Sequence, residues 1–178
     1  MDDVQFVLLA QAGDRNAFEL LLSTIYPSLF RYIAALVGST EADDIVQDTA
    51  IQIHRKLRWL REPAHFRPWA YRTASRLAIA HLKKRKRWDF LEDHVELADT
   101  LALPEDFEAK VLWTDQLQAM ASEVSPASRA VFLLHYQHEH SLEEISAVLE
   151  IPIGTVKSRL FYAVKTLRKK FPREDSYE

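Results

Sequence analysis

The sequence has no cysteine, and it has only three glycines in 178 residues. Without a thiol the chain cannot form a disulfide, use a cysteine nucleophile, hold zinc through sulfur or sense redox state by itself. With three glycines and seven prolines it also has few residues that interrupt regular structure. We find no credible pair of strands, and the apolar spacing between these breaks is that of successive helices. The sequence therefore predicts an all-α fold.

We also find no apolar run of the length that spans a bilayer. The chain starts with the acidic stretch MDDVQ, where a secretory signal would carry bases. Hydrophobic residues still make up 48% of the sequence, which is enough for one medium domain or two small ones with their own cores. We therefore expect a cytoplasmic protein that does not insert into a membrane.

The net charge of −3 hides strong segregation of charge along the chain. Residues 1–54 carry 2 basic and 8 acidic side chains, whereas residues 55–87 carry 12 basic and 1 acidic. Residues 88–125 have 1 base and 10 acids, and residues 126–178 have 8 bases and 7 acids. Because a partner meets a local surface, the sign of each block is more informative than the total.

The first half of the chain has the apolar spacing of four helices. A short helix ends at Gly13, and a second ends at Gly38. A third, expected over residues 41–60, is capped by the Gly38-Ser39-Thr40 segment. Its predicted buried stripe comprises Val46, Ala50, Ile53 and Leu57. The two prolines of REPAHFRP predict a loop, and a fourth helix follows over residues 66–87.

Residues 89–106 are acidic, lack a clean helical period and predict a linker. Four more helices are expected after it, ending near residues 125, 138, 149 and 171. The third of these starts at a capping box, in which Ser141 and Glu144 satisfy each other's backbone N–H groups. The sequence thus predicts two small helical domains, 1–88 and 107–178, joined by an acidic linker.

The second domain contains the pattern of a helix-turn-helix in SLEEISAVLEIPIGTVKSRLFYAVKTLRKK. Ile145 and Leu149 give the first helix an apolar face, and Val156 and Leu160 do the same for the second. The first turns of the second helix would meet base edges and phosphates through Thr155, Lys157, Ser158 and Arg159. Helix pairs of this geometry also occur in bundles that bind no DNA.

One side of the predicted helix 66–87 is basic. Its members on a helical wheel are Trp69, Arg72, Arg76, Lys83 and Arg87. Such a face would neutralise phosphates, and Trp69 and Trp88 would stack on unpaired bases if they are exposed. The alternative is a charged face that only solvates the domain, with both tryptophans in the core. The second nucleic-acid signal, in the other domain, favours the first interpretation.

The third helix has the opposite sign on the side away from Val46 and Ile53. That side carries Asp44, Gln47, Asp48 and Ile51, with Asp43 beside them near the helix N-terminus. Acids around an exposed isoleucine suit a basic protein partner better than DNA, and a solvated face is the alternative.

Four segments together resemble the extracytoplasmic-function (ECF) group of bacterial RNA polymerase sigma factors. They are EADDIVQDTAIQI, FRPWAYRTASRLAIAHLKKRKR, SPASRAVFLLHY and SLEEISAVLEIPIGTVKSRL. The resemblance covers nearly the whole chain, in the family's order and spacing. It implies a promoter-recognition subunit that binds core RNA polymerase and promoter DNA, has no catalysis of its own, needs no cofactor and is held by an anti-sigma factor until a stress or signal arrives.

The resemblance also implies roles for particular residues. Docking on core polymerase is carried over to Asp43, Asp44, Gln47, Asp48 and Ile51. Recognition and melting of the minus-ten element are carried over to Arg61, His65, Phe66, Trp69, Arg72, Arg76, Lys83, Lys84 and Arg87. Recognition of the minus-thirty-five element is carried over to Thr155, Lys157, Ser158, Arg159, Phe161 and Tyr162. The acidic linker would pass through the polymerase near the RNA exit path.

The chain departs from the family pattern at four positions. Arg76 stands where many members have Asn, and Ala80 where they have Asp or Asn, so base capture is expected to differ in detail. Tyr162 and Val164 stand where the family often has arginines, which removes two expected phosphate contacts. These departures motivate an alternative function, a sigma-like decoy that sequesters an anti-sigma factor without starting transcription.

Two further alternatives stay open in the sequence. A stand-alone helix-turn-helix repressor would leave the first domain unexplained. His135, His138 and His140 have the spacing of a metal site, but no cysteine accompanies them, and we expect loop polarity and no bound metal. We find no phosphate-binding loop or nucleophile motif, so an enzyme is not expected.

Overall fold

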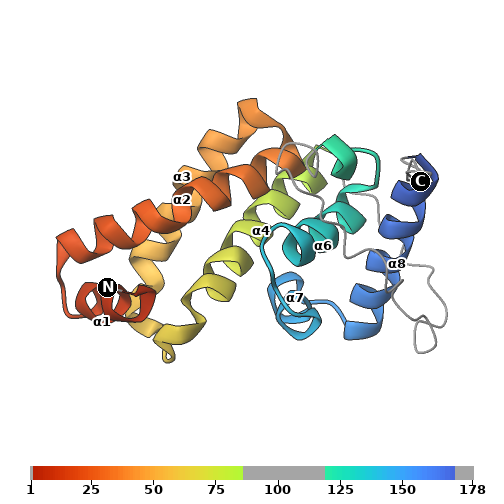
Figure 1. Ribbon diagram of the computed structural model, residues 1–178. Helices are drawn as coiled ribbons and strands as arrows, with labels where there is room; N and C mark the ends of the chain where they lie inside the picture. The colour runs from red at the N-terminus through yellow and green to blue at the C-terminus, as the bar shows by residue number, and fades with distance from the viewer. Residues whose placement is uncertain (1, 86–118, 171–178) are drawn as a thin grey trace, which may run out of the picture. The chain divides into compact units, whose positions relative to one another are not determined.

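The computed structural model describes residues 2–85 and 119–170, and in these residues it contains helices and no strand. Helices α1 to α4 belong to one compact unit, and α6, α8 and most of α7 belong to a second (Figure 1). The prediction of an all-α fold is confirmed. The predicted linker 89–106, with the domain limits on either side of it, lies outside the described residues.

The first unit begins with two helices whose starts are capped by aspartates. α1 (Asp3–Gln11) begins after Asp2, whose carboxylate accepts a backbone N–H of the first turn at 3.0 Å. Gly13 then turns the chain with a φ of +99°, a conformation that favours glycine. Asp14 caps α2 (Arg15–Val37) in the same way as Asp2 caps α1. The break between the two helices lies where the sequence predicted it.

α2 is long and apolar enough to cross a membrane by length and composition alone. The expectation that no such run exists was therefore wrong. A core helix of a soluble domain passes the same test, and α2 packs against α1, α3 and α4 (Figure 1). Its buried side chains are Ala17, Leu21, Ile25, Leu29, Tyr32, Ile33, Leu36 and Val37. The core of this unit accounts for these apolar side chains of α2, whereas Leu20 and Tyr26 of the same helix are exposed.

A buried hydrogen bond joins α2 to α4 (Phe66–Lys84). The Tyr32 hydroxyl lies 2.9 Å from Ser75 Oγ, and both side chains are buried. Burial raises the pKa of Tyr32, because a phenolate would lose its hydration there, while the hydrogen bond with Ser75 acts in the opposite direction. The Tyr32 ring also meets that of Tyr71 edge-on, with centroids 5.5 Å apart.

α3 (Ser39–Lys56) differs from the prediction at both ends. It starts directly after Gly38, and no side chain caps it, so the cap expected from Ser39 and Thr40 was wrong. At its other end the α-helix stops at residue 56. The chain continues as two short 3-10 turns, η1 (Leu57–Trp59) and η2 (Pro63–His65), before α4 begins.

The buried side of α3 faces α2 and α4. Val46, Ile53 and Leu57 are buried as predicted, whereas Ala50 is only half-buried. The remaining buried members are Ala42, Ile45 and Thr49. The Thr49 hydroxyl donates to the Ile45 carbonyl at 2.7 Å, which satisfies this polar group inside the core.

The second unit contains α6 (Pro126–Tyr136), most of α7 (Leu142–Leu149) and α8 (Ile153–Lys170), and α6 packs against α8. The predicted capping box is confirmed at the start of α7. The Glu144 N–H donates to Ser141 Oγ at 3.1 Å, and the Ser141 N–H donates to the Glu144 carboxylate at 2.8 Å.

Candidate acidic and nucleic-acid-binding surfaces

The acidic surface lies on α3 and consists of Asp43, Asp44, Gln47, Asp48 and Ile51. All five side chains are exposed, and the exposed fraction of Ile51 is 42%. Their positions alternate with the buried residues of the same helix, so they share the face that points away from the core. Within residues 2–85 and 119–170, none of the three aspartates forms an ion pair. The surface therefore offers uncompensated negative charge around an exposed aliphatic side chain.

Glu41 is an acid of α3 with a different role. One carboxylate oxygen lies 2.8 Å from His81 Nε2 and the other lies 2.8 Å from Arg85 Nη1. Glu41 and His81 are both largely buried, whereas Arg85 is about half exposed. This carboxylate ties the start of α3, the helix that carries the acidic surface, to the end of α4, the helix that carries the basic one.

The basic surface on α4 consists of Trp69, Arg72, Arg76, Lys83 and Lys84. Arg76 and the two lysines are exposed, and Trp69 and Arg72 are half-buried. The Trp69 ring is tilted against that of Phe66, with centroids 6.3 Å apart, so only part of the indole faces solvent. Ala80 is exposed on the same helix, and Arg87 lies outside the described residues. The opposite side of α4 is buried, as the wheel predicted.

The loop before α4 exposes some of its predicted DNA contacts and buries one. Arg61 and His65 are exposed, and His65 Nδ1 lies 2.9 Å from the Glu62 carboxylate. Phe66, however, is only 1% exposed and belongs to the core. Phe66, which was predicted to touch DNA, thus packs inside the unit and anchors the end of the loop to the core.

Gln11 of α1 fixes the beginning of this loop. Its side-chain Nε2 donates to the Leu57 carbonyl at 2.9 Å and to the Leu60 carbonyl at 2.8 Å. Both hydrogens of one amide are thus used on the turn that follows α3. The path of the chain into the loop is therefore set by α1.

Trp59 of η1 was not among the residues predicted from the sequence. Its side chain is 61% exposed, and the Arg58 guanidinium carbon lies 4.0 Å from the ring centroid. The signal was present in the segment KLRWLRE, where an aromatic residue stands between two arginines. The period of an α-helix did not reveal it, because residues 57–59 form a 3-10 turn.

In the second unit, α8 begins after the turn that closes α7. Glu150 ends α7 in the left-handed region with a φ of +57°, and the Ser146 hydroxyl donates to the Ile151 carbonyl at 2.6 Å. The buried side of α8 comprises Val156, Ser158, Arg159, Leu160, Ala163, Val164 and Leu167. This arrangement matches the expected helix-turn-helix pattern.

The six side chains predicted to read DNA from α8 do not all share its exposed side. Thr155, Lys157 and Phe161 are half-exposed, and Tyr162 is 46% exposed. Ser158 is buried and donates to the Thr155 carbonyl at 3.0 Å, while Arg159 is only 5% exposed. The two residues of α8 that depart from the family pattern also differ in burial, because Tyr162 is exposed and Val164 is fully buried.

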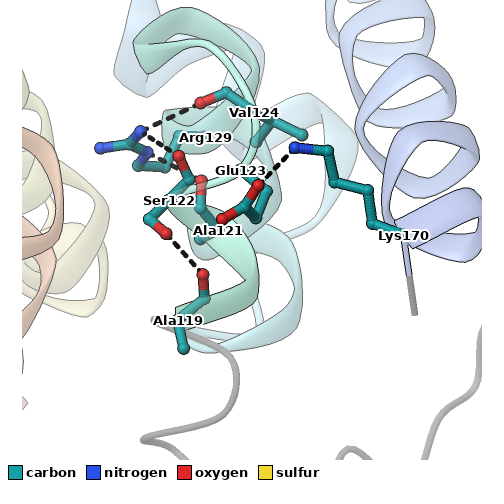
Figure 2. Close-up of polar contacts among 7 residues, drawn as sticks. All are labelled: Ala119, Ala121, Ser122, Glu123, Val124, Arg129 and Lys170. Atoms are coloured by element: carbon teal, nitrogen blue, oxygen red, sulfur yellow. Dashed lines mark hydrogen bonds and ion pairs between the residues drawn. The ribbon is translucent and has the colours of Figure 1, made fainter.

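Arg129 of α6 holds the segment that precedes α6 (Figure 2). Its guanidinium donates to the carbonyls of Ala121 at 2.8 Å, Ser122 at 3.0 Å and Val124 at 3.0 Å. Partial burial lowers the pKa of Arg129 because it penalises the charged form. Lys170 at the end of α8 pairs with Glu123 of the same segment (Figure 2). Residues 119–124 are thereby fastened to both long helices of this unit.

The three histidines lie around the end of α6 and the start of α7. His135 Nδ1 is 3.1 Å from the His140 carbonyl oxygen, and His140 Nδ1 is 3.6 Å from the Glu144 carboxylate. Within the part of the chain that the structure describes, no group of three or more His, Asp or Glu side chains is placed to hold a metal ion. These contacts tie the α6–α7 connection together.

Two protein families match this chain. Residues 21–88 match sigma-70 region 2, and residues 114–167 match the sigma-70 region 4 family. Among curated proteins, the RNA polymerase sigma-H factor of Pseudomonas aeruginosa is 30% identical over 94% of this chain and 92% of its own length. The ECF RNA polymerase sigma factor SigW of Bacillus subtilis is 29% identical over 88% of this chain and 90% of its own length.

Two solved structures have a similar fold. The sigma factor RpoE of Bartonella quintana, crystallised with the anti-sigma factor NepR, has a TM-score of 0.65 at 22% identity and covers 88% of this chain and 98% of its own. CnrH in complex with the cytosolic domain of CnrY has a TM-score of 0.66 at 20% identity and covers 94% of this chain and 96% of its own. At these identities the likeness concerns the fold.

Proposed function

This chain belongs to the ECF family of RNA polymerase sigma factors, and from that premise we propose that it binds core RNA polymerase and directs it to a limited set of promoters. Sigma factors are transcription initiation factors rather than enzymes, and the chain would act in the cytoplasm without catalysis of its own. The observation that carries the proposal is the separation of an acidic surface on α3 from a basic surface on α4 of the same unit. Two surfaces of opposite sign suit two partners of opposite charge.

The acidic surface is the proposed docking site for core polymerase. Asp43, Asp44 and Asp48 surround Ile51, and all are exposed on one helix face. Exposed carboxylates attract a basic protein surface and speed its approach, while the isoleucine adds apolar contact. Phosphates would be repelled by the same charges, so DNA is a poor partner for this face.

The basic surface of α4 and the loop before it are the proposed minus-ten site. Arg61, His65, Trp69, Arg72, Arg76, Lys83, Lys84 and Arg87 are its proposed contacts, with Phe66 supporting them from the core. Lysine and arginine neutralise phosphates, and a partly exposed indole provides a stacking surface for a base. Arg76 and Ala80 leave this chain without the amide that many relatives have there, so base capture would use charge and stacking.

The start of α8 is the proposed minus-thirty-five site. Thr155, Lys157, Phe161 and Tyr162 have exposed or half-exposed side chains. Ser158 and Arg159 also belong to the proposed site, and their burial implies that they hold the helix in place or must move to reach a base. The proposed domains are residues 1–88 for polymerase and minus-ten binding and 107–178 for minus-thirty-five binding, joined by the acidic linker 89–106.

An anti-sigma factor is the proposed regulator. The similarly folded sigma factor RpoE of Bartonella quintana was solved with the anti-sigma factor NepR, and the similarly folded CnrH was solved with the cytosolic domain of CnrY. Release of this chain by a stress or signal would then control transcription of its promoters.

Runoff transcription tests the proposed function. Purified chain is added to core RNA polymerase and a library of bacterial upstream regions, and discrete transcripts are expected that core polymerase alone does not make. Absence of any such transcript would contradict the proposal. Affinity for an anti-sigma factor without affinity for core polymerase would instead favour a decoy, and tight operator binding without polymerase would favour a repressor.

A further inference from the structure

A cavity of about 330 Å³ lies in the first unit, between the turn that joins α1 to α2 and the end of α3 with η1. Its lining comes from residues between 10 and 18 and between 54 and 58, outside the acidic surface and the basic surface assigned above. Sites for small molecules have volumes of about 300 to 1,000 Å³, so this cavity has the size for a small ligand.

One wall of the cavity is apolar. Phe18 of α2 meets the His54 ring edge-on, with centroids 4.9 Å apart, and Leu57 of η1 adds an aliphatic side chain. Leu57 is buried and Phe18 is half-buried, so the fold holds both. Gln11 fixes the same wall, because its amide donates to the Leu57 and Leu60 carbonyls. An apolar group that packs on this wall would therefore cost little conformational entropy.

The ionisable part of the lining is mainly basic. Arg15, His54 and Arg58 line the cavity, together with the acid Asp14. The Asp14 carboxylate accepts the Ala17 N–H at 3.0 Å, at the start of α2, where the helix dipole favours negative charge. Because the helix start already offsets this acid, the bases give the cavity a positive character.

Both arginines have donors to offer a ligand. Arg15 Nε lies 3.1 Å from the Glu19 carboxylate, but both side chains are largely exposed, so this ion pair is weak and a ligand can compete with it. The Arg58 guanidinium carbon lies 4.0 Å from the Trp59 ring centroid, and this cation–π contact restrains the group beside the cavity. A guanidinium has five N–H donors, which are enough for a ring contact and an anion together.

We propose that this cavity binds a small organic anion, with a carboxylate or phosphate group at Arg15 and Arg58 and an apolar body against Phe18 and Leu57. His54 would add a hydrogen bond from its ring. Arginine binds carboxylate and phosphate through the same charge-assisted hydrogen bonds, so the two head groups share one chemistry here. Binding needs only the chain itself and so does not depend on the proposed function. The bound anion would join the start of α2 to η1.

Binding is measured on the full chain with four probes. Benzoate and phenyl phosphate join the two head groups to an aromatic ring, inorganic phosphate is a head group alone, and benzyl alcohol is a ring without charge. Isothermal titration calorimetry should give a dissociation constant of about 1 mM for benzoate or phenyl phosphate, and at least tenfold weaker binding for the other two probes. The tighter of benzoate and phenyl phosphate identifies the preferred head group.

Substitutions test the two arginines. Arg15→Gln and Arg58→Gln should each weaken binding of the tighter probe by about 5- to 20-fold, because each removes a charge-assisted hydrogen bond at a partly exposed position. Arg55→Gln removes an exposed base of α3 that is not in the lining, so it is the matched control and should stay within twofold of wild type. All three side chains are exposed, so the variants should fold, and thermal unfolding checks this.

Amide chemical shifts measured by NMR locate the ligand. Benzoate should shift the resonances of Gly13 and Arg15 in the α1–α2 turn, together with those of His54 and Arg58. The resonances of α4 and α8 should stay unchanged, although both helices carry many bases.

Three results would overturn the inference. If neither benzoate nor phenyl phosphate binds at about 10 mM, the cavity takes no such ligand. If inorganic phosphate binds as tightly as phenyl phosphate, or if the shifts lie on α4 or α8, the chain binds an adventitious ion only. If Arg15→Gln and Arg58→Gln both bind the tighter probe within twofold of wild type, the arginines do not hold the anion.

Discussion

The carboxylate of Glu41 lies 2.8 Å from Nε2 of His81, and these two residues join the start of α3 to the last turn of α4. Both side chains are largely removed from solvent, and Arg85 adds a second contact to the same carboxylate. Glu41 thus adds a polar contact to the packing between the helix proposed for protein binding and the helix proposed for DNA binding.

Glu41→Gln should destabilise the first unit. The substitution keeps the size of the side chain and removes the charge that His81 and Arg85 share, at a cost of about 1 to 2 kcal/mol in the free energy of unfolding. Urea denaturation of the full chain measures it. Asp43→Asn, an exposed acid of the same helix, is the control and should change stability by less than about 0.5 kcal/mol. Equal effects of the two substitutions would deny Glu41 this role.

Reversing charge on the acidic surface should separate polymerase binding from folding. The double variant Asp44→Lys, Asp48→Lys places two bases beside Ile51, and we expect at least a tenfold loss of affinity for core polymerase. Fluorescence anisotropy of labelled protein titrated with core polymerase gives the affinity. Glu19→Lys, an exposed acid of α2, should leave it within twofold. Loss of thermal stability in the double variant would show that these residues support the fold instead.

Tyr162→Arg should strengthen binding to minus-thirty-five DNA. Tyr162 is exposed on α8, so an arginine there gains a phosphate contact and raises the salt slope of duplex binding by about 0.9. Affinity measured against salt concentration detects the change, with Tyr162→Gln as the uncharged control. Val164→Arg is expected to behave differently, because this side chain is fully buried and a charge there would disrupt the core. A steeper slope with Tyr162→Gln as well would contradict the phosphate explanation.

Arg129→Ala should loosen the segment before α6. The change removes donors to three carbonyls and costs about 2 to 3 kcal/mol. Hydrogen exchange of the full chain should show faster exchange in residues 119–124, and Arg129→Lys should restore only part of the protection because an ammonium lacks the planar fork. Lys169→Ala, at an exposed position of α8, serves as the control. Unchanged exchange in Arg129→Ala would rule out the anchoring role.

Tyr32 should make the first unit sensitive to alkali. Its pKa is raised in the folded state by burial, so the folded chain keeps the proton while an unfolded tyrosine loses it near pH 10. The stabilising contribution is therefore complete below about pH 10. It falls by about 1.4 kcal/mol per pH unit above that, until the raised pKa of the folded state is reached. Urea denaturation between pH 8 and 11 measures it. Tyr32→Phe should show a shallower loss, and identical profiles would contradict the prediction.

The sequence correctly predicted features that depend only on the spacing of residues along one helix. The acidic surface follows from Val46 and Ile53 on one side of α3 and Asp44 and Asp48 on the other, and their burial and exposure agree with that expectation. The capping box of Ser141 and Glu144 was equally local. Such features depend on residues three or four positions apart, which share a turn.

Side-chain burial could not be predicted from the sequence where tertiary packing decides it. Arg159 and Phe66 have sequence positions typical of DNA contacts, but their side chains are buried in the structure. The end of α3 was predicted at residue 60, four residues later than observed, because the apolar spacing does not distinguish the last α-helical turn from the 3-10 turn that follows. The proposed assignments of individual side chains to polymerase and promoter remain predictions for the experiments above.

Gln11 donates both of its amide hydrogens to backbone carbonyls of a turn that lies 46 to 49 residues further along the chain. A helix that carries none of the proposed DNA contacts thereby sets the starting point of the loop that carries several. Gln11→Ala would change none of the proposed contact residues, but it would release the Leu57 and Leu60 carbonyls and so alter the position of the loop relative to the DNA. The position of the loop proposed to contact the minus-ten element is then set in part by α1, a helix that carries none of the proposed contacts.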